Sequence, residues 1–232
     1  MKTTLASQSF RDFLSQTLRE APRKLPATLL ALLGYYSLPL CAHPYLLFSL
    51  PMLGPVLACG LVFLTQPLAS KTQLRQPQDR NTMRYLMWAT LVSQMVTVAE
   101  WAYFSPDHSF RWSNAAMGGL ALMALGLVVR VAAITELGKY FANIVYIRHD
   151  HQLIQTGTYR YVRHGSYTGA YLIALGIGVS LSAWVGVGVS VVVLGWAYYY
   201  RIKQEEKVLT DRFGDDYRAY QLRTWMLIPF VL

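Results

Sequence analysis

The amino-acid sequence predicts an all-α, polytopic integral membrane protein with about six transmembrane helices and a C-terminal cover on the cytosolic side. The first observation is composition, because 54% of the 232 residues are hydrophobic and only 14% are charged, against roughly 25% charged residues in a soluble domain. The second is a series of apolar runs close to the roughly 20 residues that a helix needs to cross the hydrocarbon core. The third is the distribution of Lys and Arg, which sorts by side of the membrane.

Six apolar runs are separated by short polar or proline-containing segments. Proline removes a backbone donor and ends a helix, and Pro44 and Pro106 each fall between two runs, so the first four runs form two hairpins. The tight connection Ser182-Ala183 makes the last two runs a third hairpin, whose glycines permit close helix packing. The predicted spans are 25–42, 45–64, 83–104, 113–135, 167–181 and 184–200.

The segments outside these runs define three regions. Residues 7–24 have the pattern of an amphipathic helix, which is typical of a helix on the membrane surface. Region 1–24 is therefore predicted as an interfacial helix, region 25–135 as four spans, and region 136–232 as the last hairpin with the polar segments around it. Within that third region a charged helix continues into the cytosol, and an apolar tail from Trp225 is expected to return to the interface.

The basic residues indicate which side each segment faces. With the N-terminus in the cytosol, all of the 21 Lys and Arg residues except Arg111 lie on the inner side or at its boundary, as short cytoplasmic loops require. The net charge of +9 is thereby explained by orientation, so membrane lipids are expected as partners and nucleic acid is not. The prediction is a multi-pass protein of a bacterial inner membrane, or of the endoplasmic reticulum in a eukaryote.

Residues capable of chemistry concentrate in two clusters. Apolar periodicity lapses over 136–166, where histidine and tyrosine accumulate, and Arg201, Glu205 and Glu206 follow the last span. Because an antiparallel hairpin brings its ends together, both clusters are expected to line one pocket. Taken alone, Arg201 and Glu205 are more typical of an exposed helical ion pair, and a loop histidine such as His151 is more often structural.

The two cysteines do not extend this chemistry. Cys41 and Cys59 lie inside apolar runs and match no metal or redox spacing, so each is interpreted as a small buried apolar residue. No metal site is predicted.

The two clusters belong to a longer ordered pattern. The stretch LGKYFANIVYIRHDHQLIQTGTYRYVRHGSYTG is followed, one hairpin later, by RIKQEEKVLTDRFGDDYRAY and IPF. Its six elements are LG-x-x-F, H-x-L-x-x-x-G-x-Y, RH-x-SY-x-G, a glutamate-rich helix start, FG-x-x-Y-x-x-Y and a terminal IPF. This pattern, over roughly 95 residues, resembles the C-terminal half of isoprenylcysteine carboxyl methyltransferases. It departs from that family at Gly165, where proline is usual, and at Tyr146, where the eukaryotic enzymes tend to have glutamine. The chain also has about two N-terminal spans fewer than those enzymes, which is more typical of prokaryotic relatives.

The resemblance implies that S-adenosylmethionine binds between the last hairpin and its cytosolic cover, without a Rossmann domain. The sequence agrees in lacking a glycine-rich strand-to-helix fingerprint. The resemblance also implies catalytic roles for Arg201, which falls at the position facing the methyl acceptor, and for Glu205. The cofactor contacts that it implies are Tyr146, His151, Gln152, Leu153, Ile154, Tyr159, His164, Gly165, Ser166, Tyr167 and Glu205.

The favoured reaction is methylation of a lipophilic acceptor, above all the carboxylate of a prenylcysteine-like molecule. Such a carboxylate is already ionised near neutral pH, so positioning and exclusion of water suffice. The alternatives are methylation of a phospholipid amine or small thiol, for which His151 or His164 could act as the base, an NADPH-dependent sterol-reductase-like enzyme, and a transporter or membrane scaffold. The sequence leaves the oligomeric state open.

Overall fold

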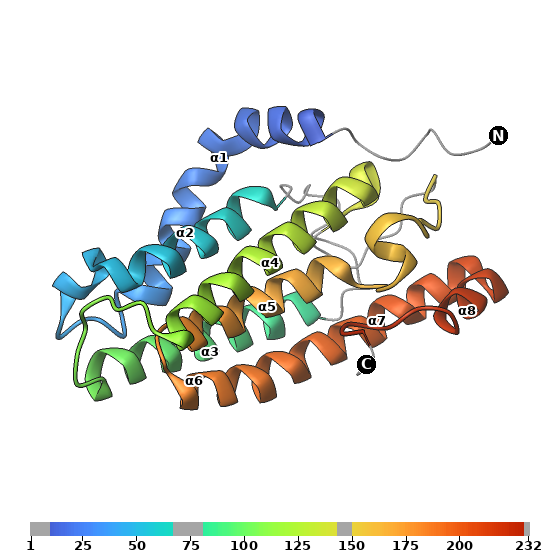
Figure 1. Ribbon diagram of the computed structural model, residues 1–232. Helices are drawn as coiled ribbons and strands as arrows, with labels where there is room; N and C mark the ends of the chain where they lie inside the picture. The colour runs from blue at the N-terminus through green and yellow to red at the C-terminus, as the bar shows by residue number, and fades with distance from the viewer. Residues whose placement is uncertain (1–9, 67–80, 143–149, 230–232) are drawn as a thin grey trace.

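In the computed structural model of the protein, residues 10–66, 81–142 and 150–229 are described (Figure 1). Every regular element in these ranges is a helix, and an isolated bridge between Val162 and Trp225 is the one β-type pairing found among them. The all-α prediction is confirmed. The α-helices are α1 (Phe10–Tyr36), α2 (Leu50–Thr65), α3 (Thr82–Phe104), α4 (Asn114–Leu137), α5 (Gly165–Ser180), α6 (Trp184–Val189), α7 (Gly195–Phe213) and α8 (Asp215–Gln221), and the short helical turns are η1 (Pro44–Phe48), η4 (Gly138–Tyr140), η5 (Gly157–Arg160) and η6 (Ser190–Leu194).

The long helices lie alongside one another in an elongated bundle, with the charged end of α7 and α8 extending from one end (Figure 1). Among the described residues, two helices are long and apolar enough to cross a membrane. These are the continuous helices Asn114–Tyr140, of 27 residues, and Trp184–Phe213, of 30 residues, while Leu50–Thr65 is apolar but shorter. The remaining predicted spans are also helical, and the six-span topology stays a prediction.

Helix α1 differs in continuity from what the sequence predicts. The expected interfacial helix and the expected first span form one element, Phe10–Tyr36, which contains Pro22 and Pro26 and is visibly bent (Figure 1). A proline inside a helix removes one hydrogen bond and can kink the helix without ending it. Lys24, at this bend, is buried, where it donates to the carbonyl of Leu64 at 3.0 Å and pairs with Glu20 at 2.9 Å.

Helices α4 and α5 approach each other backbone to backbone. A Cβ added at Gly126 would lie 2.6 Å from the carbonyl oxygen of Gly169, and one added at Gly169 would lie 2.5 Å from that of Gly126. Only glycine fits such a crossing. The predicted close packing of the glycines in the last hairpin holds at Gly176 and Gly186, but it is wrong at Gly188, where an added Cβ would meet nothing within 4 Å. The crossing sets the start of α5 beside the end of α4.

The other end of the last hairpin is held by a half-buried acidic side chain. The carboxylate of Glu100, on α3, accepts hydrogen bonds from the N–H groups of Val185 at 3.1 Å and Gly186 at 2.7 Å. These donors belong to the first turn of α6, which has no intrahelical partners for them. Glu100 thus caps the returning helix and fixes it against α3.

Candidate active site

The two chemistry-bearing clusters meet where the start of α5 faces the middle of α7. The Arg163 Nε donates to Glu206 at 2.8 Å, and the His164 Nε2 lies 3.4 Å from the same carboxylate. The Tyr167 hydroxyl donates to Glu205 at 2.7 Å. The predicted meeting of the two hairpin ends is therefore found in the structure.

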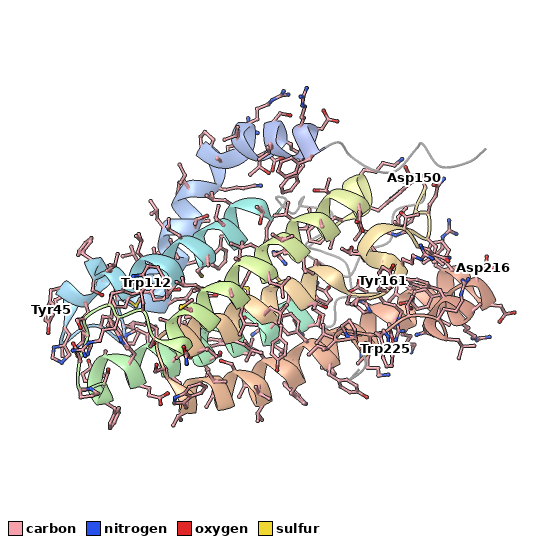
Figure 2. The ribbon with its side chains drawn as sticks, viewed as in Figure 1. Tyr45, Trp112, Asp150, Tyr161, Asp216 and Trp225 are labelled. Carbon is pink, nitrogen blue, oxygen red and sulfur yellow. The ribbon has the colours of Figure 1, made fainter. Side chains whose placement is uncertain are left out.

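The C-terminal tail closes this end of the bundle. The Trp225 N–H donates to the carbonyl of Tyr161 and the Arg163 N–H donates to the carbonyl of Trp225, both at 2.8 Å; Figure 2 shows Tyr161 and Trp225 at this end. The Thr168 hydroxyl donates to the Leu227 carbonyl at 2.5 Å. Because non-helical backbone must find partners, the tail is held by the same segment that carries the RH-x-SY motif.

A second anchor ties the motif segment to α4. The Thr158 N–H and hydroxyl donate to the carboxylate of Glu136 at 2.7 and 2.6 Å. Gly157 has a φ of 56°, and a Cβ there would overlap the Glu136 carboxylate. The turn therefore requires glycine. It places the buried Tyr159 beside α8, where the Tyr159 carbonyl accepts from the Tyr220 hydroxyl at 2.6 Å.

Between these anchors lies a polar cavity, defined by the residues that line it. Eight of the predicted cofactor residues line it, namely His151, Leu153, Ile154, Tyr159, His164, Ser166, Tyr167 and Glu205. Gln152 and Gly165 are not among its lining residues, and Tyr146 lies outside the described residues. The cavity is also lined by residues that were not among the predicted cofactor contacts, which are Leu137, Tyr140, Phe141, Ala142, Arg163, Val208, Leu209, Tyr217 and Tyr220.

Part of this omitted set carried a signal in the sequence. Arg163 belongs to the RH-x-SY-x-G element, and Tyr217 and Tyr220 are the two tyrosines of FG-x-x-Y-x-x-Y. The apolar residues Val208 and Leu209 carry none, since any amphipathic helix presents such residues. The tyrosine pair could have been found by asking what covers a cavity that faces the start of α5.

The two neighbouring glutamates of α7 have different environments. Glu206 lies in the charged continuation of the helix, with its side chain 7% exposed. Burial opposes its ionisation, but hydrogen bonds and positive charge from His164 and Arg163 outweigh burial and lower the pKa of Glu206 to about 2. Glu205 is 31% exposed and lines the polar cavity. Glu206 thus binds Arg163 and His164 of the RH-x-SY motif, whereas Glu205 presents a carboxylate to the polar cavity.

The tyrosines of the cover are neutral phenols at physiological pH. Burial raises the pKa of Tyr159, Tyr217 and Tyr220, and nearby carboxylates reinforce the shift. The Tyr217 hydroxyl lies at the polar cavity, buried and without a hydrogen-bond partner in the described structure. A buried hydroxyl of this kind is available as a donor to a ligand.

A second cavity, which we call the apolar cavity, adjoins the first. Helices α1, α2, α3, α4, α5 and α7 and the η6 turn contribute to its mostly apolar lining, and it shares Phe141, Ala142 and Tyr167 with the polar cavity. Arg201 lines it and is 1% exposed. The interpretation of Arg201 as part of an exposed ion pair is therefore wrong.

Arg201 is connected across the wall that the two cavities share. Its Nε donates to the Tyr167 hydroxyl at 2.9 Å, and another guanidinium nitrogen donates to the Thr82 hydroxyl at 3.0 Å. The Tyr167 hydroxyl in turn donates to Glu205. These hydrogen bonds form one continuous network from Arg201 through Tyr167 to Glu205. The network links a cation at the apolar cavity with a carboxylate at the polar cavity.

Comparisons with known proteins show which family the chain belongs to. The family model of the isoprenylcysteine carboxyl methyltransferase (ICMT) family matches residues 119–211. Protein-S-isoprenylcysteine O-methyltransferase B of Arabidopsis thaliana is 32% identical over 146 residues, which cover 62% of this chain and 73% of that protein. The chain belongs to the ICMT family. The predicted resemblance is confirmed, and with it the prediction of a membrane methyltransferase.

Other ICMT relatives are matched over less of their length. The protein-S-isoprenylcysteine O-methyltransferase of Schizosaccharomyces pombe is 34% identical over 125 residues, which cover 53% of each chain. The probable enzyme of Oryza sativa subsp. indica is 31% identical over 49% of this chain and 60% of its own. The chain thus spans little more than half the length of these two relatives. Among solved structures, that of the eukaryotic intramembrane Ras methyltransferase ICMT matches with a TM-score of 0.44 and 20% identity, over 94% of this chain and 86% of that one.

The part of the chain that matches the ICMT family contains the centre of the site and leaves out its periphery. Residues 119–211 include Tyr167, Arg201 and Glu205, the three residues of the hydrogen-bond network at the shared wall. Tyr217 of the cover follows this region, and Thr82, which accepts from Arg201, precedes it. The match to the ICMT family model therefore includes the place where the two cavities touch.

Proposed function

We propose that this ICMT-family chain transfers a methyl group from S-adenosylmethionine, held in the polar cavity, to the carboxylate of a prenylcysteine-like lipid held in the apolar cavity. The observation that carries the proposal is the shared wall. A carboxylate, Glu205, lies on its polar side, a buried guanidinium, Arg201, lies on its apolar side, and Tyr167 connects them. Two ligands of opposite polarity would meet at Tyr167.

The residues of the polar cavity fit the proposed cofactor. S-adenosylmethionine has a sulfonium, an amino group, a carboxylate and an aromatic base, for which carboxylates, donors and ring faces are complementary. Glu205 supplies the carboxylate, and the unpartnered Tyr217 hydroxyl supplies a donor. When bound, the cofactor supplies a methyl group activated on a sulfonium. Glu205 would hold its positive end, and the aromatic residues would hold its base.

The apolar cavity fits a lipid whose reacting end is an anion. Its lining is mainly aliphatic and aromatic, and Arg201 places a cation beside the wall that faces the cofactor. A guanidinium can hold a carboxylate through two hydrogen bonds and so fix its orientation. Because the acceptor is ionised near neutral pH, the chain needs no general base. The work of Arg201 is therefore to position the acceptor while the apolar walls exclude water.

The proposed site faces the cytosol. The charged continuation of α7 and α8 extend from the end of the bundle that holds the polar cavity (Figure 1), and short basic segments favour the cytoplasmic side. A cofactor made in the cytosol would then enter directly, while the acceptor would enter from the membrane. The favoured location remains a bacterial inner membrane, or the endoplasmic reticulum in a eukaryote.

A methyl-transfer assay on the detergent-purified protein tests this function. We expect binding of S-adenosylmethionine and not of NADPH, and transfer of labelled methyl to N-acetyl-S-farnesylcysteine. The product should release its label in dilute alkali, because methyl esters hydrolyse there while N-methyl and S-methyl groups do not. An alkali-stable product from a phospholipid amine or a thiol would contradict carboxyl methylation, and binding of NADPH alone would contradict methyl transfer altogether.

A further inference from the structure

One buried cation remains outside the network of the proposed active site. Arg130 lies in α4, in the apolar helix Asn114–Tyr140, and is 4% exposed. One of its terminal nitrogens donates to the carbonyl of Ser166 at 3.0 Å. Its Nε is buried and has no hydrogen-bond partner in the described structure.

Three other buried or half-buried cations in the described structure are each connected to a carboxylate. Lys24 pairs with Glu20 at 2.9 Å and Arg163 pairs with Glu206 at 2.8 Å. Arg201 reaches Glu205 through Tyr167. For Arg130, no ion pair occurs among the residues that the structure describes. An uncompensated charge at membrane depth is costly, and such groups face cavities and serve ligands.

The position of Arg130 indicates which ligand it serves. Arg130 lines the apolar cavity and is not among the residues that line the polar cavity. Its Cβ is held against Gly169 at the close crossing of α4 and α5. Arg130 and Arg201 therefore enter one cavity from two different helices, α4 and α7, with Tyr167 also lining it.

We propose that Arg130 is a second cationic ligand of the acceptor carboxylate, which is then held between α4 and α7 by Arg130 and Arg201. This inference rests on the proposed function. A carboxylate offers about four lone-pair directions, enough for two guanidinium groups. The acceptor anion supplies the counter-charge that Arg130 lacks, so an ionised acceptor is selected over a neutral one of the same shape.

A pair of matched ligands measures this selection directly. N-acetyl-S-farnesylcysteine and its carboxamide differ in charge and have nearly the same shape. We expect the wild-type protein to bind the carboxylate about 10- to 100-fold more tightly, as charge-assisted bonds would give. In Arg130→Met this preference should fall about tenfold, while the Kd values for the carboxamide and for S-adenosylmethionine stay within about threefold.

Gln94→Leu is the matched control. Gln94 is also buried in the wall of the apolar cavity without a hydrogen-bond partner in the described structure. It lies twelve residues after Thr82 on α3, hence about 18 Å further along the helix, which is far from Arg201. Its replacement should change the Kd values of both ligands by the same factor and leave their ratio unchanged.

Each remaining result decides against the inference. If Arg130→Met keeps the full carboxylate preference, Arg130 does not bind the acceptor. If Arg130→Met also loses S-adenosylmethionine, Arg130 supports the fold through Ser166, and the inference is overturned in favour of a structural role. A wild-type protein that binds both ligands equally would contradict the proposed function itself, which is a distinct outcome from the other two.

Discussion

The two cavities that meet at Tyr167 are built in different ways. The polar cavity is lined by residues of 137–220, and most of its polar groups belong to sequence motifs. The apolar cavity takes residues from α1, α2 and α3 as well as from α4, α5 and α7. Most of its lining is apolar and of the kind that any membrane helix presents, and its charged residues are Arg130 and Arg201.

This difference follows from what each proposed ligand needs. The proposed cofactor, S-adenosylmethionine, needs charges and rings at fixed positions, which a continuous stretch of chain can carry. An acceptor with a long apolar part needs shape, which several distant helices supply together. The N-terminal helices, which lie outside the region matched by the family, are therefore where we expect selectivity among lipid acceptors to arise.

The sharpest test of this division is Arg201→Ala. Arg201 lines only the apolar of the two cavities, so kcat/KM for the acceptor should fall by about 10³-fold, the scale for removing one partner of a buried charge pair. The Kd of S-adenosylmethionine, measured by calorimetry, should change by less than about threefold. Lys207→Ala, an exposed cation on the same helix, is the control and should leave both values unchanged. Loss of cofactor binding in Arg201→Ala would contradict this division, because it would show that the two cavities do not bind their ligands independently.

Glu205→Gln should give the reverse pattern. Replacing the carboxylate removes the charge that faces the polar cavity but keeps an acceptor for the Tyr167 hydroxyl. The Kd of S-adenosylmethionine should rise about 10- to 100-fold, since charge-assisted bonds contribute about 1.5–3 kcal/mol. KM for the acceptor at saturating cofactor should stay within about threefold. An increase in that KM with unchanged cofactor affinity would place Glu205 on the acceptor side.

Tyr167→Phe tests the connection between the cavities. It keeps the ring, which stacks on His164 with centroids 5.6 Å apart, and removes the hydroxyl that links Arg201 to Glu205. Both the cofactor Kd and the acceptor KM should worsen by about five- to tenfold, the scale of one typical hydrogen bond. In the double variant with Glu205→Gln, the effects on cofactor affinity should be less than additive, because both changes disrupt the same hydrogen-bond network. Strict additivity would show that the two groups act independently.

The sequence predicts the polar cavity better than the apolar one. The meeting of His164 and Tyr167 with Glu205 and Glu206 follows from hairpin geometry, since antiparallel helices bring the ends of a hairpin together. Residues such as Tyr159 belong to a sequence motif, which predicts that they lie at the polar cavity. In contrast, the burial of Arg130 depends on how closely α4 and α5 approach at Gly126 and Gly169, which is a property of two helices packed together and not of either sequence segment.

The same reasoning explains two differences in the fold. A proline pair marks the bend of α1, but the sequence does not distinguish a kinked helix from two helices. The tail at Trp225 is apolar, which predicts a return to the interface, yet its backbone donors and acceptors are satisfied by Tyr161 and Arg163. Hydrogen bonds between distant non-helical segments leave no periodic signal in either one.

The smallest expected effect concerns the residue at which this chain departs from its family. Gly165 is the first residue of α5, where a missing N–H costs nothing and proline is well accommodated. The preceding His164 has φ −119° and ψ 50°, outside the helical region that a following proline disfavours. A Cβ at Gly165 would meet that of Ala133 at 3.2 Å, a tight contact that a shift of a few tenths of an ångström relieves. Gly165→Pro should therefore change the Kd of S-adenosylmethionine by less than about threefold and raise the melting temperature slightly, because proline restricts the unfolded chain. A loss of cofactor affinity beyond about tenfold would instead mean that the polar cavity of this chain follows a backbone path that proline cannot adopt.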